Sequence, residues 1–496
     1  MSKKTTAKAS AGKWVLLGVA AALMIPFRSW AAGSAGLAAT GLAGEPKVII
    51  VGGGLAGLVA AYELQEKGIT AHVLEAKDRW GGRIATAKYP EGLQGEYGMH
   101  EVWERDPLFE YVKKFKIPMA QPEQAYSSVI IDGKLHPFIQ NTAEEYLSAL
   151  FSPEERAEYG RWLKDCEALY DEAEDKGLTP RLEELQKVSY ADWVQSLKLP
   201  AKVAEFVRLI VECEIATDWS RISAVYGIAQ NRIVLHGTEQ CHHAKGGNKA
   251  IIEAFVGAIR GPKTLGATVT RIVRSKKANG RTEAVVYYSK EGVTRTLSAE
   301  KVVLAVPYHM LQAVQLEPTL SDEQWKAVET LIPGTYLVVH LVMEAGANES
   351  MKVEGKRFFP VLTRGPLGVV YGFLSPDRET KKSEIFTLLI HGDHARTYLE
   401  PKDKIRERLL AEMDALWPGF SKKVQGAYFY DYHPVATPGW PVGRSPIDSL
   451  SESLRQENLG LYLAGDYVYS SHAEGAVLSG REVANKIALS LEKKSQ

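Results

Sequence analysis

The stretch VIIVGGGLAGLVAAYELQEKGITAHVLE, residues 48–75, has three consecutive glycines between an apolar run and a helical pattern. The β-branched run at 48–51 is typical of a buried strand. Apolar residues from Leu55 onward recur at helical spacing, and the run at 70–74 predicts a second strand. The stretch therefore predicts a strand, a glycine turn, a helix and a second strand that ends at Glu75.

The glycines fit the pattern Gly-x-Gly-x-x-Gly at Gly52, Gly54 and Gly57. The first permits a tight turn, the second lets the backbone approach a pyrophosphate, and the third lets the helix pack closely on the strand. The helix N-terminus offers free N–H groups to that dianion. Glu75 follows Gly52 by 23 positions, which suits hydrogen bonds to an adenosine ribose. The unit predicts a dinucleotide site, with FAD and NAD both open and a glycine-rich turn of another α/β protein as the alternative.

The residues after the second strand narrow the choice of cofactor. The segment EAKDRWGGR, residues 75–83, resembles the Glu-Ala-x-x-x-x-Gly-Gly-Arg segment of the flavin-containing amine oxidase superfamily. By that resemblance, Gly81 and Gly82 pass close to the flavin of FAD. Arg79 and Arg83 would approach the phosphates and the ribityl chain, because a guanidinium grips phosphate in two places. The resemblance therefore implies FAD.

The C-terminal part resembles the same superfamily. The run LGLYLA, residues 459–464, predicts a buried strand, and Gly465-Asp466 follows it. A helical pattern starts at Glu474 and includes Ala476. In the resembled family, the Gly-Asp pair meets the ribityl-phosphate portion, and the N-terminus of the last helix faces the flavin pyrimidine ring. A helix N-terminus stabilises the negative charge of a reduced flavin.

The resemblance covers about residues 46–490 and implies an α/β fold. A Rossmann-like FAD-binding domain is interleaved with a mixed-sheet substrate domain that carries helices. In the strand-like run 266–273, Val269 would offer its backbone to the adenine ring. Runs such as TYLVVHLVM alternate with helical patterns and are expected to form the sheet that covers the substrate. We expect the FAD-binding domain at 46–125, 241–307 and 431–496, and the substrate domain at 126–240 and 308–430.

The first 45 residues have the layout of a targeting segment. Four lysines precede the apolar run 14–27, and a stretch rich in alanine and glycine follows it. The run is shorter than the roughly 20 residues of a membrane span. We therefore predict a signal peptide, with an uncleaved membrane anchor as the alternative, and a linker at 32–45. The protein is expected to be exported or periplasmic, or anchored to a membrane through this segment.

Composition excludes some classes of function. The 60 basic and 60 acidic residues balance, so nothing suggests a nucleic-acid partner. The three cysteines, Cys166, Cys213 and Cys241, are widely spaced and form neither a metal-ligand pattern nor a disulfide framework. We expect three buried thiols and no metal site.

Three residues are candidates for contact with the reacting substrate. His472 stands two residues before Glu474, where many amine oxidases carry an aromatic side chain; it can act as an acid or base, or merely line the cofactor. Trp440, in TPGWPVGRSP, can form the other wall of an aromatic cage, or simply pack. His100 is the third candidate.

His100 belongs to GEYGMHEVWERDP, residues 95–107. The Glu96-x-Gly98 pattern in this run matches the family segment that passes beneath the isoalloxazine. Glu101 and Trp103 are further candidates to point at the substrate. In many family members a lysine, linked to flavin N5 through water, follows the glycine of the segment equivalent to PGTYLVVHL. Matching that glycine puts Val338 at the position of the lysine, and this weakens the hypothesis of an oxidase that uses oxygen.

We predict a FAD-dependent oxidoreductase that oxidises an amine or amino acid by hydride transfer to flavin N5, with oxygen or quinone as acceptor. The alternative is an isoprenoid or carotenoid desaturase, because RSPI (444–447), LYLAGDY (461–467) and EGAVLSG (474–480) resemble plant-type phytoene desaturases. The absent lysine suits a lipid substrate, but the charges at 308–430 do not. The third hypothesis is a non-catalytic protein that binds FAD and a partner protein.

Overall fold

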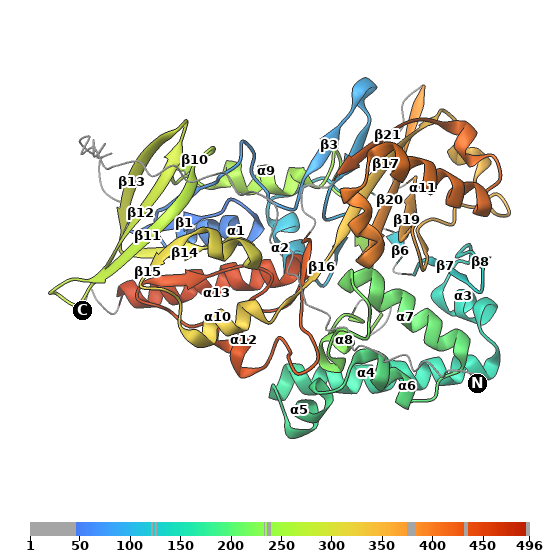
Figure 1. The fold of residues 1–496 in the computed structure, drawn as a ribbon, viewed down its shortest axis with the longest axis horizontal. Coiled ribbons are helices and arrows are strands. Elements are labelled where there is room, and N and C mark those ends of the chain that lie inside the picture. Colours follow the sequence, from blue (N-terminus) through green and yellow to red (C-terminus); the bar gives the residue numbers. More distant parts are fainter. Residues whose placement is uncertain are drawn as a thin grey trace, which may run out of the picture. The chain divides into compact units, whose positions relative to one another are not determined.

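This computed structural model describes residues 46–120, 123–124, 126–232, 234–235, 240–373, 382–430 and 435–492. It contains a five-stranded parallel sheet, part of which is labelled in Figure 1. All neighbouring strands are parallel, and the four longer ones are fully buried. In order across the sheet, the strands are β10 (Lys263–Thr264), β2 (Ala71–Leu74), β1 (Val48–Val51), β14 (Lys301–Leu304) and β23 (Leu461–Leu463).

Apolar layers cover both faces of this sheet, as parallel sheets require. Alternate residues such as Val48 and Ile50 pack with the helices α1 (Leu55–Glu66), α9 (Lys249–Ala258) and α13 (His472–Glu492). Ile49 and Val51 face the other way and pack with a second sheet. Its strands, in order, are β13 (Val293–Ala299), β12 (Thr282–Lys290), β11 (Thr268–Lys276) and β15 (Gln315–Glu317).

A separate, seven-stranded sheet is mixed. Most of its neighbouring strands are antiparallel, and β18 and β7 are parallel. One face packs against α11 (Lys402–Leu416) around buried residues such as Phe386. In order, the strands are β21 (Val424–Tyr430), β17 (Tyr336–Glu344), β20 (Ser383–His391), β19 (Val369–Gly372), β18 (Val361–Leu362), β7 (Ser128–Ile131) and β8 (Lys134–His136).

Helices fill most of the chain between β8 and α9, around the fully buried Trp162. They are α3 (Ala143–Leu150), α4 (Pro153–Lys176), α5 (Pro180–Gln186), α6 (Tyr190–Ser196), α7 (Ala201–Ile215) and α8 (Ala224–Ala229). The remaining α-helices and strands are β3 (Thr86–Lys88), β4 (Gln94–Glu96), β5 (Val102–Trp103), α2 (Pro107–Lys114), β6 (Glu123–Gln124), β9 (Gln240–His242), α10 (Asp322–Glu329), β16 (Ile332–Gly334), β22 (Thr437–Gly439) and α12 (Ser449–Ser453).

These elements confirm the predicted α/β fold with a Rossmann-like sheet. The last helix begins at His472, two residues before the predicted start. The three cysteines are free and buried, as predicted. The domain boundaries stay a prediction, and the targeting segment lies outside the described residues. Among the described residues, no helix is long and apolar enough to cross a membrane.

The helices α1 and α13 come from opposite ends of the chain and pack side by side (Figure 1). Gly480 of α13 makes the close approach possible. A Cβ added there would lie 2.6 Å from the Ala56 carbonyl oxygen and 3.0 Å from Val59 Cβ, both on α1. A glycine at this position lets the C-terminal helix lie directly on the helix that follows the first glycine turn.

We predict that Gly480→Ala lowers the free energy of unfolding by about 1–3 kcal/mol, because the methyl group overpacks the α1–α13 contact. The matched control is Gly160→Ala in α4, where an added Cβ meets no atom within 4 Å. That change should stabilise the protein by up to about 1 kcal/mol through helix propensity. Thermal unfolding of both variants tests the prediction, which fails if Gly480→Ala is as stable as the parent.

Candidate functional site

Side chains and turns of interest gather at the carboxyl ends of the parallel strands. Gly52 follows β1, Glu75 follows β2, Ala305 follows β14 and Gly465 follows β23. In open α/β sheets, ligands bind at this edge, where the order of the strands reverses. Here the reversal lies between β1 and β14, so the first glycine turn stands at the switch point.

The first glycine turn has the features of a pyrophosphate site. Gly52 has a φ of 111°, and an added Cβ would lie 2.3 Å from the Ala305 carbonyl oxygen. At Gly54 an added Cβ would meet no atom within 4 Å, so the backbone borders open space. No side chain caps the N-terminus of α1, and its first turn contains no acidic residue. The free N–H groups therefore suit an anion such as the pyrophosphate of FAD.

The second glycine turn lies directly against the first. The Gly81 N–H donates to the Gly53 carbonyl oxygen at 2.8 Å, and an added Cβ on Gly82 would lie 3.4 Å from Gly54 Cα. Arg79 donates from Nη2 to the Gly82 carbonyl oxygen at 2.9 Å. The Arg79 side chain thus braces its own turn, and its predicted phosphate contact stays a prediction.

The side chain of Glu75 holds the first glycine turn by hydrogen bonds to the backbone. Its carboxylate accepts the Gly53 N–H at 2.7 Å and the Lys77 N–H at 2.9 Å, and the residue is buried. A carboxylate has about four acceptor positions, so these two bonds leave capacity for ribose hydroxyls. The ribose contact stays a prediction, and the brace on Gly53 is a role that the sequence did not indicate.

Arg83 and Asp466 form a two-pronged ion pair across the site. Arg83 Nη1 and Nη2 lie 2.6 and 2.8 Å from the two Asp466 carboxylate oxygens, and Nη1 also donates to the Ala436 carbonyl oxygen. The Asp466 side chain is 4% exposed, so this charge depends on its partner. The pair joins the second glycine turn to the end of β23, while the predicted phosphate and ribityl contacts stay predictions.

The segment after β23 is held against α13. The Gly465 N–H donates to Ser479 Oγ at 2.9 Å, and Ser479 is fully buried. Ala476 lies one helical turn before Gly480 and packs in the apolar layer that contains α1. The predicted contact between the first turns of α13 and the flavin stays a prediction.

Residues of the helical segment hold the N-terminus of α13. Ser471 Oγ accepts from the Tyr226 hydroxyl at 3.1 Å and lies 3.0 Å from Gln230 Oε1. Arg232 forms an ion pair with Glu474 in the first turn of α13. The positive end of the helix dipole is therefore fixed beside the carboxyl edge of the parallel sheet.

His472 is the first residue of α13 and has a φ of 75°. Its Nε2 lies 3.0 Å from the backbone carbonyl oxygen of Glu214, so Nε2 carries the proton and donates it. Burial lowers the pKa of His472 to about 4, and the nearby Arg232 charge acts in the same direction. The imidazole is therefore neutral at pH 7, with Nδ1 as a hydrogen-bond acceptor.

Glu214, near the C-terminus of α7, is the unexpected member of the site. Its Oε2 lies 3.8 Å from His472 Nε2, and 31% of its side chain is exposed. The Tyr336 hydroxyl donates to the backbone oxygens of Cys213 and Glu214. Burial, followed by repulsion from the Glu101 carboxylate, raises the pKa of Glu214 to about 8, while Arg232 opposes this shift.

One face of the mixed sheet is aromatic where it meets the segment 95–100. The rings of His100 and Tyr371 stack with centroids 4.4 Å apart, and those of Tyr97 and Tyr430 stack at 4.1 Å. Val338, buried on β17, lies opposite Tyr430. His100 is thus buried by stacking, and its catalytic role stays a prediction.

Other candidates from the sequence have clear structural partners. Glu96 accepts the Asn248 N–H at 3.0 Å and the Thr86 hydroxyl at 2.8 Å, so it ties β4 to β3 and to the start of α9. Trp103 lies on β5, which pairs with β9. Val269 is buried at a bulge of β11, and its adenine contact stays a prediction.

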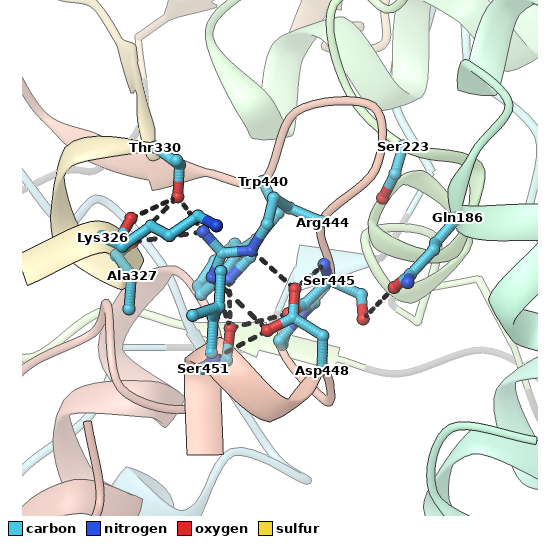
Figure 2. Close-up of polar contacts among 12 residues, drawn as sticks. Gln186, Ser223, Lys326, Ala327, Thr330, Trp440, Arg444, Ser445, Asp448 and Ser451 are labelled. Carbon is cyan, nitrogen blue, oxygen red and sulfur yellow. Dashed lines mark hydrogen bonds and ion pairs between the residues drawn. The ribbon is translucent and has the colours of Figure 1, made fainter. Parts of the chain in front are cut away.

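Trp440 is a correction. The structure leaves none of its surface exposed, and its Nε1 donates to Ser451 Oγ at 2.9 Å within a buried polar cluster that includes Arg444 and Asp448 (Figure 2). Its ring packs at 5.0 Å from that of Tyr226. A side chain enclosed in this way has no face for a substrate. The aromatic-wall hypothesis is therefore wrong, and packing is its role.

Sequence reasoning missed Glu214, Ser471 and Arg232. Ser471 adjoins His472, so a search around that candidate would have included it. Glu214 is the last residue but one of an amphipathic helix in which several acidic residues have no motif around them. Its contact with His472 joins residues 258 positions apart, which no local pattern reveals.

Comparison with known proteins identifies the family. The sequence profile of flavin containing amine oxidoreductase matches residues 55–488, so the chain belongs to that family. The family is one of FAD-dependent oxidoreductases, and FAD is the cofactor of this chain. The bare turn at Gly54 and the uncapped end of α1 fit that cofactor.

The relatives act on different substrates. Human lysine-specific histone demethylase 2 is 25% identical over 478 residues, which cover 89% of this chain and 53% of that protein. The chain thus spans about half the length of this relative. The 15-cis-phytoene desaturase of Arabidopsis thaliana is 24% identical over 90% of this chain and 80% of its own length. Cyclohexylamine oxidase from Brevibacterium oxydans has the same fold, with a TM-score of 0.72 and 21% identity over 90% of this chain and 100% of that one.

We predict that Arg83→Met destabilises the protein more than Asp466→Asn, because only the first leaves a buried carboxylate without its cation. The Arg83 side chain is 29% exposed, so it tolerates the loss of its partner better. Urea unfolding of both single variants and the double variant should give a coupling energy of about 0.5–3 kcal/mol. Additive effects would show that the pair contributes no stability.

We predict that Glu75→Ala weakens the retention of FAD, because the variant loses the ribose acceptor and the brace on the Gly53 N–H. Flavin released during dialysis, measured by fluorescence, gives the result. Glu66→Ala is the control, since Glu66 is exposed and pairs with Lys114 away from the glycine turn. If Glu75→Ala holds flavin as tightly as the parent, the assigned role is wrong.

Proposed function

We propose that the protein oxidises an amine or amino acid by a two-electron reaction that depends on FAD. The observation that carries this proposal is the chemistry around His472. A carboxyl group, Glu214, and the phenols of Tyr336 and Tyr371 lie within electrostatic range of one another. Such groups suit a polar nitrogen substrate, and a hydrocarbon would have to desolvate them without compensation.

The residues that would hold FAD are those at the carboxyl edge of the parallel sheet. Gly52, Gly54 and the N-terminus of α1 would take the pyrophosphate, and Glu75 the ribose. The N-terminus of α13 would face the flavin ring. When bound, FAD supplies N5 as the acceptor for a hydride from the substrate carbon next to nitrogen.

The side chain of His472 would orient the substrate. Its Nε2–H is engaged by the Glu214 carbonyl oxygen, so the ring cannot rotate freely and Nδ1 stays an acceptor. A neutral imidazole fixed in this tautomer can accept a hydrogen bond from a substrate N–H. The same side chain could receive a proton from the substrate, although its low pKa makes it a weak base.

A desaturase is the second candidate function. Val338 at the position of the family lysine favours it, and so does the similarity to a phytoene desaturase over 90% of this chain. Oxygen and a quinone both remain proposals for the electron acceptor. Export or membrane anchoring through residues 1–45 likewise remains a proposal.

An anaerobic substrate screen separates these functions. We predict that primary amines or amino acids bleach the flavin absorbance of the purified holoenzyme, while phytoene leaves it unchanged. The panel should include cyclohexylamine, benzylamine, 1,4-diaminobutane, the common L-amino acids and phytoene in detergent. Bleaching by phytoene alone would replace the amine proposal with the desaturase.

We predict that His472→Ala slows flavin reduction by an amine while FAD stays bound, because the acceptor that orients the substrate is lost. His472→Asn, which keeps a short polar side chain, should retain part of the rate. Stopped-flow reduction and the flavin content of each variant are the measurements. An unchanged rate in His472→Ala would return this residue to a packing role.

A further inference from the structure

We propose that the edge strand β21 pairs with β21 of a second copy of this chain, so that two mixed sheets join into one sheet across a two-fold axis. The partner is therefore a protein surface identical to its own, and the contact is a ladder of backbone hydrogen bonds between antiparallel strands. This inference goes beyond the proposed oxidation and does not depend on it.

The strand β21 stands at the end of the seven-stranded sheet and pairs on its inner side with β17. No other strand in the described part of the chain pairs with it. Apart from the pairing with β17, residues 424–429 make no backbone–backbone hydrogen bond to any other described residue. In an antiparallel pair, alternate residues bond to the neighbouring strand. The remaining N–H and C=O groups of β21 therefore form a row along its outer edge.

The composition of β21 differs from that of the other edge strands. Proteins keep edge strands from pairing by making them short, charged or covered. The strand β21 has seven residues, VQGAYFY, with neither a charged side chain nor a proline. The other edge strands of the described sheets with four or more strands carry a charge or are fully buried: β8 contains Lys134, β10 contains Lys263, β13 contains Arg295, β15 contains Glu317, and β23 is buried. Among these edges, β21 is the one that lacks such protection.

The outer edge of β21 is accessible. Tyr428 is 39% exposed, and Gln425 is exposed as well. Gly426 and Ala427, which lie between them, are partly exposed. Because Gly426 has no side chain, its exposed surface is backbone. A second strand can therefore reach the backbone of β21.

The inner contacts hold β21 in a fixed conformation. The ring of Tyr428 stacks on that of Tyr89, with centroids 4.3 Å apart. Tyr89 belongs to the β3–β4 hairpin, which lies over the face of the sheet: a Cβ added to Gly95 of β4 would lie 2.5 Å from His340 Cε1 on β17. The hairpin thus leaves the outer edge open. A strand that is already ordered loses little conformational entropy when it pairs.

The regular part of β21 defines how two copies overlap. It runs from Gly426 to Tyr430, because the pairing with β17 shifts by one residue at Gln425. Full overlap of two such segments places the axis at Tyr428, so that its exposed ring meets the same ring of the second copy. Gly426 then faces Tyr430, and a glycine leaves room for an aromatic ring. Aromatic pairs across antiparallel strands stabilise the pairing.

The charges beside β21 favour the antiparallel orientation. Lys422 and Lys423 directly precede the strand. A parallel pairing would place the lysines of the two copies side by side, whereas an antiparallel pairing places them at opposite ends of the ladder. Residues 424–430 carry no charge, so no like charges face each other along the ladder. The strand therefore fits a second copy of itself in this orientation.

The size of the contact sets its strength. Because the ladder is short, we expect a reversible dimer with a dissociation constant of about 1–100 μM. Sedimentation velocity of the FAD-loaded protein, at concentrations across and beyond that range, measures the constant.

A charge exchange at Tyr428 is the sharpest test, since the axis brings each new charge against its own copy. Tyr428→Lys and Tyr428→Glu should each raise the dissociation constant of the dimer at least about fivefold. An equimolar mixture of the two variants should recover the dimer, because a lysine then faces a glutamate. A role of Tyr428 within one copy alone does not produce this recovery.

A second variant and a control accompany this test. Gly426→Lys places a charge in the ladder and should weaken the dimer in the same way. A Cβ added at Gly426 would lie at an ordinary contact distance, 3.9 Å from Val342 Cβ, so the fold tolerates the change. Val293→Lys is the matched control on the edge strand β13, where Val293 is 54% exposed, and should keep the constant of the parent. Flavin content and circular dichroism establish that each variant is folded.

A protein that stays monomeric at every concentration would overturn the proposal. So would a dimer whose constant is unchanged in both Tyr428→Lys and Gly426→Lys, or an equimolar mixture of the charge variants that stays monomeric. None of these measurements uses a substrate, so they are independent of the amine screen. A monomeric protein would leave the proposed oxidation in place.

Discussion

The ion pair between Arg83 and Asp466 is the contact on which the geometry of the site depends. It joins residues 383 positions apart, at the end of the second glycine turn and the end of β23. A carboxylate that is 4% exposed would be costly without this cation. Segments from the first and last parts of the described chain are therefore held at one edge of the parallel sheet, with α13 lying against α1.

The helical segment contributes a second constraint. It contacts the site through Tyr226, Arg232 and Glu214, which bind successive parts of the α13 N-terminus. The orientation of that helix end, and with it the dipole that faces the cofactor region, is set by residues that do not belong to the nucleotide fingerprint. A change in how the helical segment packs would alter the environment of His472 without touching any glycine turn.

Local patterns predicted the parts of the fold that follow from local physics. Periodicity gave β1, α1, β2 and α13 nearly to the residue, and Gly52 and Gly57 are sterically required as expected. The function of single side chains was harder to predict. The sequence around Trp440 suggested an aromatic wall for the substrate, but tertiary packing encloses this side chain beside Ser451. Glu75 and Arg83 were expected at the cofactor, and each also braces protein backbone, which a motif does not record.

The amino-acid order alone was sufficient for the dinucleotide turn, because glycine sterics and strand and helix periods act over a few neighbouring residues. The protonation of Glu214 could not be predicted in this way. Glu101 and Glu214 are separated by more than a hundred positions, and the protonation of Glu214 depends on burial and on charges from several elements. Electrostatic energies depend on distance in space, so the chemistry of this carboxyl group was decided only when the chain had folded.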